Sequence, residues 1–215
     1  LASFLIIGTF TIYSQFNFLT TQKLGYDDSN LVMVNKEGLT HRQASVFKEQ
    51  LLKNRDILGV SAKNGGNWGT AARVNGDSSL QFTYETVDES YLPLLKIPLV
   101  AGRNFSPDYP ADSNNSVIVN ESFVKTAGWK NPIGHEIDFP NDNDKIYHVI
   151  GVVKDYHFAS LNQKIEPELF TMKNDNPYGT YYIKIKPNSA ATSLKVIQKT
   201  FKQLYPMSPY SYVFK

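Results

Sequence analysis

Residues 30–62 read NLVMVNKEGLTHRQASVFKEQLLKNRDILGVSA. The apolar run at 30–35 predicts a strand, and the run at 57–62 predicts a second one. Between these runs, apolar side chains recur at helical spacing, namely Ala44, Phe47, Leu51 and Leu52. This periodicity predicts a helix that begins at Thr40 or His41 and ends near Asn54. The order strand, helix, strand predicts a βαβ unit.

The carboxyl-terminal fifth of the chain repeats this order. Residues 181–185 predict a strand, 190–205 a helix and 210–214 a last strand. The helix carries one apolar face, formed by Leu194, Ile197, Phe201 and Leu204. Two terminal βαβ units with a strand-rich block between them predict an α+β fold in two lobes. One is a ferredoxin-like lobe, and the other is a strand-rich lobe inserted into it.

This interpretation divides the chain into four parts. Residues 1–24 are the end of a transmembrane helix and a stalk. Residues 25–100 and 166–215 are the two parts of the ferredoxin-like lobe, and residues 101–165 are the inserted strand-rich lobe. Strands are expected at 72–74, 80–87, 116–119, 136–139, 147–154 and 169–172. Asn120 is expected to cap a helix over 121–127. Gly102 and Gly134 are expected in turns that require a positive φ or close packing.

The amino-terminal residues carry no charge before Lys23, and they are apolar over residues 4–13 and more polar from Ser14 onward. Their core, residues 4–13, is shorter than the roughly 20 residues that span a bilayer. We interpret it as the outer end of a transmembrane helix, with Tyr13, Phe16 and Phe18 near the interface, where aromatic side chains collect. A signal peptide fits less well because the basic n-region is missing. A buried amphipathic helix of a soluble domain is the remaining alternative.

Composition excludes several classes of site. The 215 residues are 41% hydrophobic and 20% charged, which is typical of a folded domain. The net charge is +2, and the basic residues are scattered, so a nucleic-acid partner is not expected. The chain has no cysteine, which excludes disulfides and thiolate zinc sites. No catalytic, cofactor or metal residue is predicted.

Two places remain as candidate sites. Asp155 and His157 project to the same side of an extended backbone, where they could hydrogen-bond or share a metal. A metal needs three or four ligands, and the other histidines show no recognisable spacing, so an inter-lobe hinge is the preferred interpretation. Trp68 lies in the Gly-rich stretch 64–69, which predicts a mobile loop or a wide turn. It could be an exposed contact for a partner, or it could fold back over the core.

Short motifs follow one another through the middle of the chain: AGRNF at 101–105, VIVNE at 117–121, WKNPIG at 129–134, VIGVVKDYHF at 149–158, SL at 160–161 and IEP at 165–167. LGYD at 24–27 precedes them, directly after the apolar segment. In order and spacing this set resembles the MacB-like periplasmic core domain of FtsX-like ABC transporter permeases. The resemblance covers roughly residues 85–170, and each motif alone is weak.

The resemblance implies a non-catalytic domain in the periplasm, anchored in the cell inner membrane between two helices of a permease. It implies that the ferredoxin-like lobe is the porter-like lobe of this family and that the inserted strand-rich lobe is the smaller of the two. It implies ATP hydrolysis on a separate cytoplasmic ATPase subunit or domain, and movement of the periplasmic domain with that cycle. A permease homodimer and a periplasmic partner protein are further implied partners. Some relatives carry two such domains, and the start of this chain suggests the second copy. Docking residues for a tripartite efflux pump are not identifiable.

Two other functions stay open at this stage. A membrane-tethered extracytoplasmic ligand sensor would have a concave pocket with a few converging polar groups. A membrane-anchored hydrolase would need a nucleophile, a base and oxyanion donors within mutual reach, and the sequence shows no such set.

Overall fold

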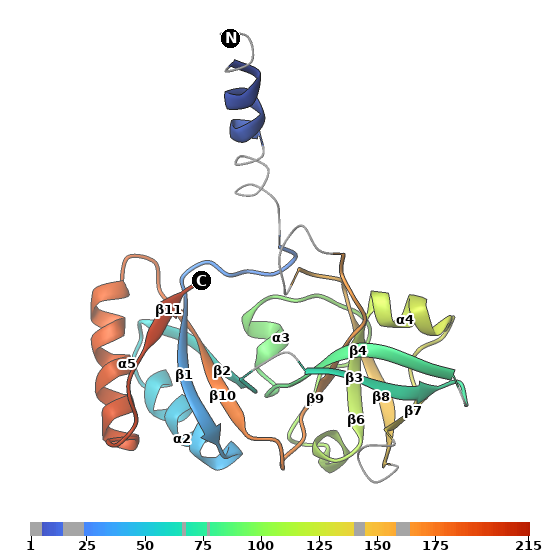
Figure 1. The fold of residues 1–215 in the computed structure, drawn as a ribbon. Helices are drawn as coiled ribbons and strands as arrows, with labels where there is room; N and C mark the ends of the chain where they lie inside the picture. Colours follow the sequence, from blue (N-terminus) through green and yellow to red (C-terminus); the bar gives the residue numbers. More distant parts are fainter. Residues whose placement is uncertain (1–5, 15–23, 66–67, 77, 140–144, 158–163) are drawn as a thin grey trace.

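The computed structural model describes residues 6–14, 24–65, 68–76, 78–139, 145–157 and 164–215. The strands form a four-stranded sheet and a seven-stranded sheet, which lie side by side in Figure 1. The predicted α+β class is therefore confirmed. Phe16, Phe18 and the SL motif at 160–161 lie outside the described residues, and so do residues 140–144 of the turn that the sequence predicts at 140–145.

The four-stranded sheet is built from the two ends of the chain. Its elements are β1 (Leu31–Leu39), α2 (His41–Leu52), β2 (Ile57–Lys63), β10 (Tyr178–Ile185), α5 (Ala190–Leu204) and β11 (Tyr212–Phe214). The strand order β11-β1-β10-β2 is antiparallel throughout, so each βαβ unit is split by a strand of the other. This is the ferredoxin-like arrangement that the two terminal patterns predicted. Helices α2 and α5 cover one face (Figure 1).

Local chemistry explains where α2 begins. The side chain of Thr40 accepts a hydrogen bond from the Gln43 backbone, and the Gln43 side chain accepts one from the Thr40 backbone. This capping box satisfies two donors that the first helical turn leaves free. The helix then packs Ala44, Phe47 and Leu51 onto the sheet, where Phe47 meets the ring of Tyr181.

The seven-stranded sheet contains β3 (Trp68–Val74), β4 (Ser78–Thr86), β5 (Leu99–Gly102), β6 (Ser116–Asn120), β7 (Glu136–Phe139), β8 (Lys145–Val153) and β9 (Glu168–Thr171). Its order is β5-β8-β6-β9-β4-β3-β7, and β7 also pairs with β8. That additional pairing closes six strands into a barrel, with β5 bonded beside β7 along β8. Closure removes exposed strand edges. The short helices are α3 (Tyr91–Leu94), η1 (Pro110–Ser113) and α4 (Glu121–Ala127).

Strand pairing differs from the predicted lobe boundaries. Residues 68–86, assigned from sequence to the porter-like lobe, pair as β3 and β4 with barrel strands. The inserted part is also the larger sheet rather than the smaller. Asn75 and Gly76, between β3 and β4, both have positive φ, as residues in short hairpin turns often do. The chain reverses there, so β3 pairs antiparallel with β4. The expected loop at 64–69 therefore ends as a strand that begins at Trp68.

Residues 6–14 form a helix that stands apart from both sheets in Figure 1. Its large apolar side chains are exposed, including Ile6, Phe10 and Ile12. The structure therefore does not show the alternative of an amphipathic helix buried in the domain. Among the described residues, none of the helices has the length and apolar character needed to cross a membrane. That this helix is the end of a transmembrane segment stays a prediction.

Candidate functional site at the junction of the two sheets

The two sheets share a buried apolar layer, which we call the junction. It takes side chains from both sheets and from α3 between them: Leu31 and Tyr182 from the four-stranded sheet, Tyr91, Leu92 and Leu95 from the α3 region, and Ile118, Val153, Tyr156 and Phe170 from the barrel side. The four-stranded sheet is therefore covered on both faces, by helices on one and by the barrel on the other. A change in the angle between the sheets would have to repack this layer.

A buried ionic cluster crosses the junction. Lys63, at the end of β2, donates a hydrogen bond to Glu85 of β4. Glu168, at the start of β9, accepts one from the hydroxyl of Tyr156 at 3.2 Å. Glu85 is 1% exposed and Glu168 0%. Charged groups are rarely this buried unless they are paired, so this cluster is the most unusual chemistry in the domain.

The protonation states in the cluster follow from burial. Burial raises the pKa of Glu168 well above its ordinary range, and the carboxylate of Glu85 raises it further. Burial alone would lower the pKa of Lys63, but Glu85 outweighs it, so the pKa of Lys63 is raised. Burial also raises the pKa of Tyr156, so its hydroxyl keeps its proton. Lys63 is thus charged, and Glu168 favours its neutral form.

A second ionic cluster ties the sheets together at another edge. Lys48 of α2 donates to Glu89 at 2.7 Å and to Asp88 at 3.2 Å, and Ser61 donates to Asp88 at 2.6 Å. Burial raises the pKa of Asp88, although Lys48 opposes this. Lys48, Asp88 and Glu89 border a cleft of about 250 Å³ between α2 and the segment that contains η1. The ion pairs of Lys48 thus join α2 to the segment that follows β4.

The chain enters the domain at this junction. Residues 24–28, which we call the entry segment, contact the four-stranded sheet and the connection between α3 and β5: Asp27 pairs with Lys184 of β10 at 2.9 Å and with Lys96 at 2.7 Å. Hydrogen bonds from Lys184 and Lys96 hold the pKa of Asp27 well below its ordinary value. Tyr26 packs edge-on against Tyr156, with ring centroids 5.7 Å apart.

Asp155 and His157 lie beside the entry segment. The backbone N–H of His157 donates to the carbonyl of Leu24 at 2.8 Å. Asp155 points the other way: its carboxylate accepts from the backbone and hydroxyl of Ser122, at 2.9 and 2.7 Å, in the first turn of α4. The two side chains therefore do not share one partner. Their role as an inter-lobe hinge stays a prediction, and the residue between them, Tyr156, makes the buried contact that sequence reasoning missed.

We expect Asp155→Ala to lower the free energy of unfolding by about 1–2 kcal/mol, because α4 loses two bonds to its first-turn donors and a favourable negative charge. Lys154→Ala, at an exposed neighbouring position, is expected to change it by less than about 0.5 kcal/mol. Urea unfolding measured on both variants checks this. Equal losses in the two would show that the contact with Ser122 does not stabilise the domain.

Comparisons with known proteins agree with this geometry. The family model for the MacB-like periplasmic core domain matches residues 1–198. The chain belongs to this family. It is a periplasmic domain of a MacB-like ABC transporter permease. The family is one of transporter permease domains, which are generally non-catalytic. No curated protein matches the chain.

Three solved structures share the fold of this MacB-like domain. The periplasmic region of MacB from Actinobacillus actinomycetemcomitans has a TM-score of 0.66 and 21% identity, over 88% of this chain and 90% of that one. A domain of a permease protein from Porphyromonas gingivalis has a TM-score of 0.64 and 14% sequence identity, and the match covers 87% of this chain and 91% of that one. The extracellular domain of the noncanonic ABC-type transporter YknZ from Gram-positive bacteria has a TM-score of 0.65 and 13% sequence identity, and the match covers 86% of this chain and 100% of that one.

Trp68 of this MacB-like domain is 58% exposed at the start of β3. The alternative, a side chain folded over the core, does not agree with that exposure. Its role as a partner contact stays a proposal. Within the described ranges, groups of three or more His, Asp or Glu side chains that could hold a metal ion are absent.

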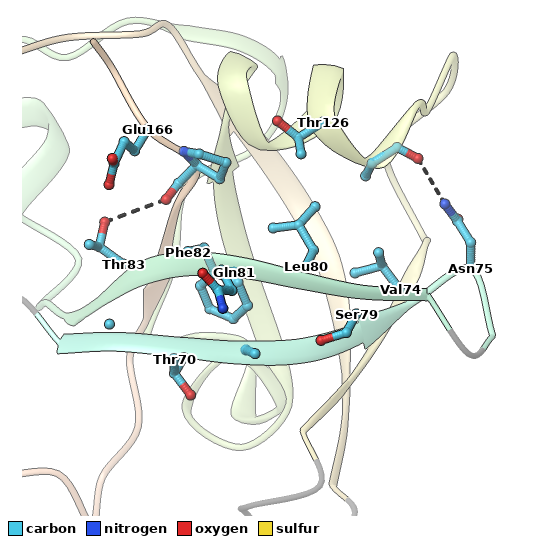
Figure 2. Close-up of a pocket in the computed structure, with 14 residues that line it drawn as sticks. Thr70, Val74, Asn75, Ser79, Leu80, Gln81, Phe82, Thr83, Thr126 and Glu166 are labelled. Atoms are coloured by element: carbon cyan, nitrogen blue, oxygen red, sulfur yellow. Dashed lines mark hydrogen bonds between the residues drawn. The ribbon is translucent and has the colours of Figure 1, made fainter. Parts of the chain in front are cut away.

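The MacB-like domain has an open groove of about 930 Å³ beside the β3–β4 hairpin and α4. Figure 2 shows that its polar side chains are spread along the strands instead of converging on one point. Several already bond within the domain: Thr83 to the Pro167 carbonyl, Asn75 to the Ala127 carbonyl, and Thr126 to the Ser122 carbonyl. Among the described lining residues, these three polar side chains are therefore already used in bonds within the domain.

Proposed function

We propose that this domain couples ATP hydrolysis in the cytoplasm to movement in the periplasm, in support of substrate export or of contact with a partner protein. The observation that carries the proposal is the double attachment of the entry segment. Asp27 pairs with Lys96 on one side and with Lys184 on the other. A displacement arriving through the preceding residues would therefore reach β10 of the four-stranded sheet and the connection that leads from α3 into β5 of the barrel sheet.

The attachment lies at the layer that must repack if the sheets move. Gly25 packs so closely on Tyr156 that an added Cβ would lie 2.9 Å from the Tyr156 Cβ. Lys215 lines the same small cavity as Tyr26 and Tyr156, so the last described residue lies near the entry segment. We propose the inner membrane as the anchor.

The proposed partners follow from this role. An ABC ATPase subunit or domain would act through the rest of the permease, and a second copy of the permease would form a homodimer. A periplasmic partner protein would contact the exposed barrel, where Trp68 offers the large aromatic side chain that hot spots favour. Efflux of a substrate is one outcome of such coupling.

The test is a distance measurement in the full-length permease with its ATPase in lipid vesicles. Because the 215 residues contain no cysteine, Gln50→Cys on α2 and Lys125→Cys on α4 would place spin labels one on each lobe of the domain. We expect the distance distribution to shift when ATP is added, and Asp27→Ala to reduce that shift because it breaks both ion pairs. The neighbouring Asp28→Ala serves as the control.

Identical distributions with and without ATP, in vesicles that still export substrate, would contradict coupling through this domain. A shift caused by a small molecule without ATP would instead support the alternative function of a ligand sensor.

A further inference from the structure

We propose that Glu85 and Glu168 form a one-proton site that keeps the junction closed when it holds the proton and loosens the junction when the proton leaves. The inference concerns the domain itself and does not depend on transport. It arises from the positions of the two carboxyl groups relative to Lys63 and to the cavity beside them.

The strand register brings the two carboxyl groups together. In the parallel pair of β4 and β9, Thr83 lies opposite Glu168, and Glu85 lies opposite Phe170. Glu85 and Glu168 are therefore diagonal neighbours on one face of the sheet, a spacing that long side chains can bridge. That face is the one turned toward the junction, because Phe170 belongs to the junction layer.

The hydrogen bonds of the cluster are incomplete by one donor. Lys63 satisfies one oxygen of Glu85, and Tyr156 satisfies one oxygen of Glu168. Within the described part of the chain, the second oxygen of each carboxyl group is buried and has no hydrogen-bond partner. One proton on Glu168 would supply the missing donor, and Glu85 Oε2 is an unused acceptor on the same face. A protonated carboxyl can donate, whereas two carboxylates can only accept.

The charged and titratable groups around the two carboxyl groups also favour the state in which Glu168 carries a proton. Lys63 from β2 is the cation bonded to Glu85, and Lys215 also lines the cavity. Tyr91 from α3, Tyr182 from β10 and Tyr26 from the entry segment line it too. Burial raises the pKa of each of these tyrosines, to about 12 for Tyr26, so they stay neutral. Asp155 adds repulsion toward Glu168.

Loss of the proton would leave two carboxylates beside Lys63 in a layer with little water. The adjoining cavity has a volume of about 40 Å³, which is room for a water molecule but not for the hydration of two ions. The negative charges would be hydrated only if the sheets separate. Because the pKa of Glu168 is raised in the folded state, its stabilisation is complete below about pH 4.5 and is lost as pH rises through the folded-state pKa.

Two measurements on the 215-residue chain test the proposal. Infrared spectroscopy at neutral pH should show a protonated carboxyl band that Glu168→Gln removes. Spin labels at Gln50→Cys and Lys125→Cys should report a distance distribution that broadens as pH rises from about 5 to about 9, the range in which buried glutamates titrate. Glu168→Gln, which mimics the neutral carboxyl, should keep the distribution narrow. The exposed Glu136→Gln should behave like the parent chain.

Absence of the carboxyl band, or equal broadening in the parent chain and in Glu168→Gln, would overturn the proposal. If Glu168→Gln does not fold, Glu85→Gln decides the matter. It removes the neighbouring negative charge, so the carboxyl band should disappear at a lower pH than in the parent chain. An unchanged pH for that loss would show that the two carboxyl groups do not act as a pair. Neither measurement uses ATP, so failure here is separate from failure of the transport proposal.

Discussion

Lys63→Met is expected to lower the free energy of unfolding at neutral pH by about 3–5 kcal/mol, because it leaves Glu85 buried without its counter-charge. Glu85 is 1% exposed, and Lys63 joins it across the junction from the other sheet. Urea unfolding of the parent chain and of the variant at neutral pH measures the loss.

The matched control is Lys96→Met. Lys96 also pairs with an acid, Asp27, but its side chain is 73% exposed. Such pairs contribute little, so a change below about 1 kcal/mol is expected. The double variant Lys63→Met, Glu85→Leu should recover much of the loss, because it removes the unpaired charge as well. Equal losses for Lys63→Met and Lys96→Met would show that water reaches the cluster in the folded domain.

Sequence reasoning succeeded where local patterns decide structure. The terminal strands and helices were predicted because apolar residues recur at the periods of a strand or a helix, as Phe47 and Phe201 do. The cap at Asn120 was predicted from residue type alone, and its side chain accepts from the Phe123 backbone. Gly102 and Gly134 both have positive φ, as expected. Each of these features depends on a few consecutive residues.

Reasoning from sequence failed where distant segments meet. The alternation in β4 places Phe82 and Tyr84 on one face, which suggests that Glu85 faces water. Glu85 is instead buried, because the other sheet covers the outer face of the barrel. Its partner Lys63 lies on β2, in the other sheet, and Glu168 lies on β9. Alternation of apolar and polar residues along a strand predicts burial of one face only. Burial of the second face can be predicted only when the tertiary arrangement is known.

Barrel closure was missed for a related reason. The pairing of β7 with β8 is an ordinary hairpin that the sequence did predict, but the pairing of β7 with β3 joins residues far apart in the chain. The Asn75–Gly76 turn was a local signal that could have extended β3 back to Trp68. Its use would have moved the lobe boundary from residue 100 toward residue 68.

Gly102→Ala is expected to lower the free energy of unfolding by about 3–5 kcal/mol, for two reasons that act together. Gly102 has φ +70°, where a side chain is strained. In addition, an added Cβ would lie 2.1 Å from the carbonyl oxygen of Ile150 and 2.9 Å from the Cα of Gly151. Both atoms belong to the backbone of β8, so β5 would have to move away from its partner strand.

Gly128→Ala separates these two causes. Gly128 ends α4 with φ +71°, almost the same conformation, but an added Cβ there has no atom within 4 Å. It should therefore show only the conformational cost, about 1 kcal/mol. Thermal or urea unfolding of both variants gives the difference, which is the steric contribution of the β5–β8 contact. If Gly102→Ala and Gly128→Ala lower the free energy of unfolding equally, β5 can shift away from β8 without a measurable cost. The close contact of Gly102 with β8 would then not fix the position of the Arg103–Asp112 pair that follows β5.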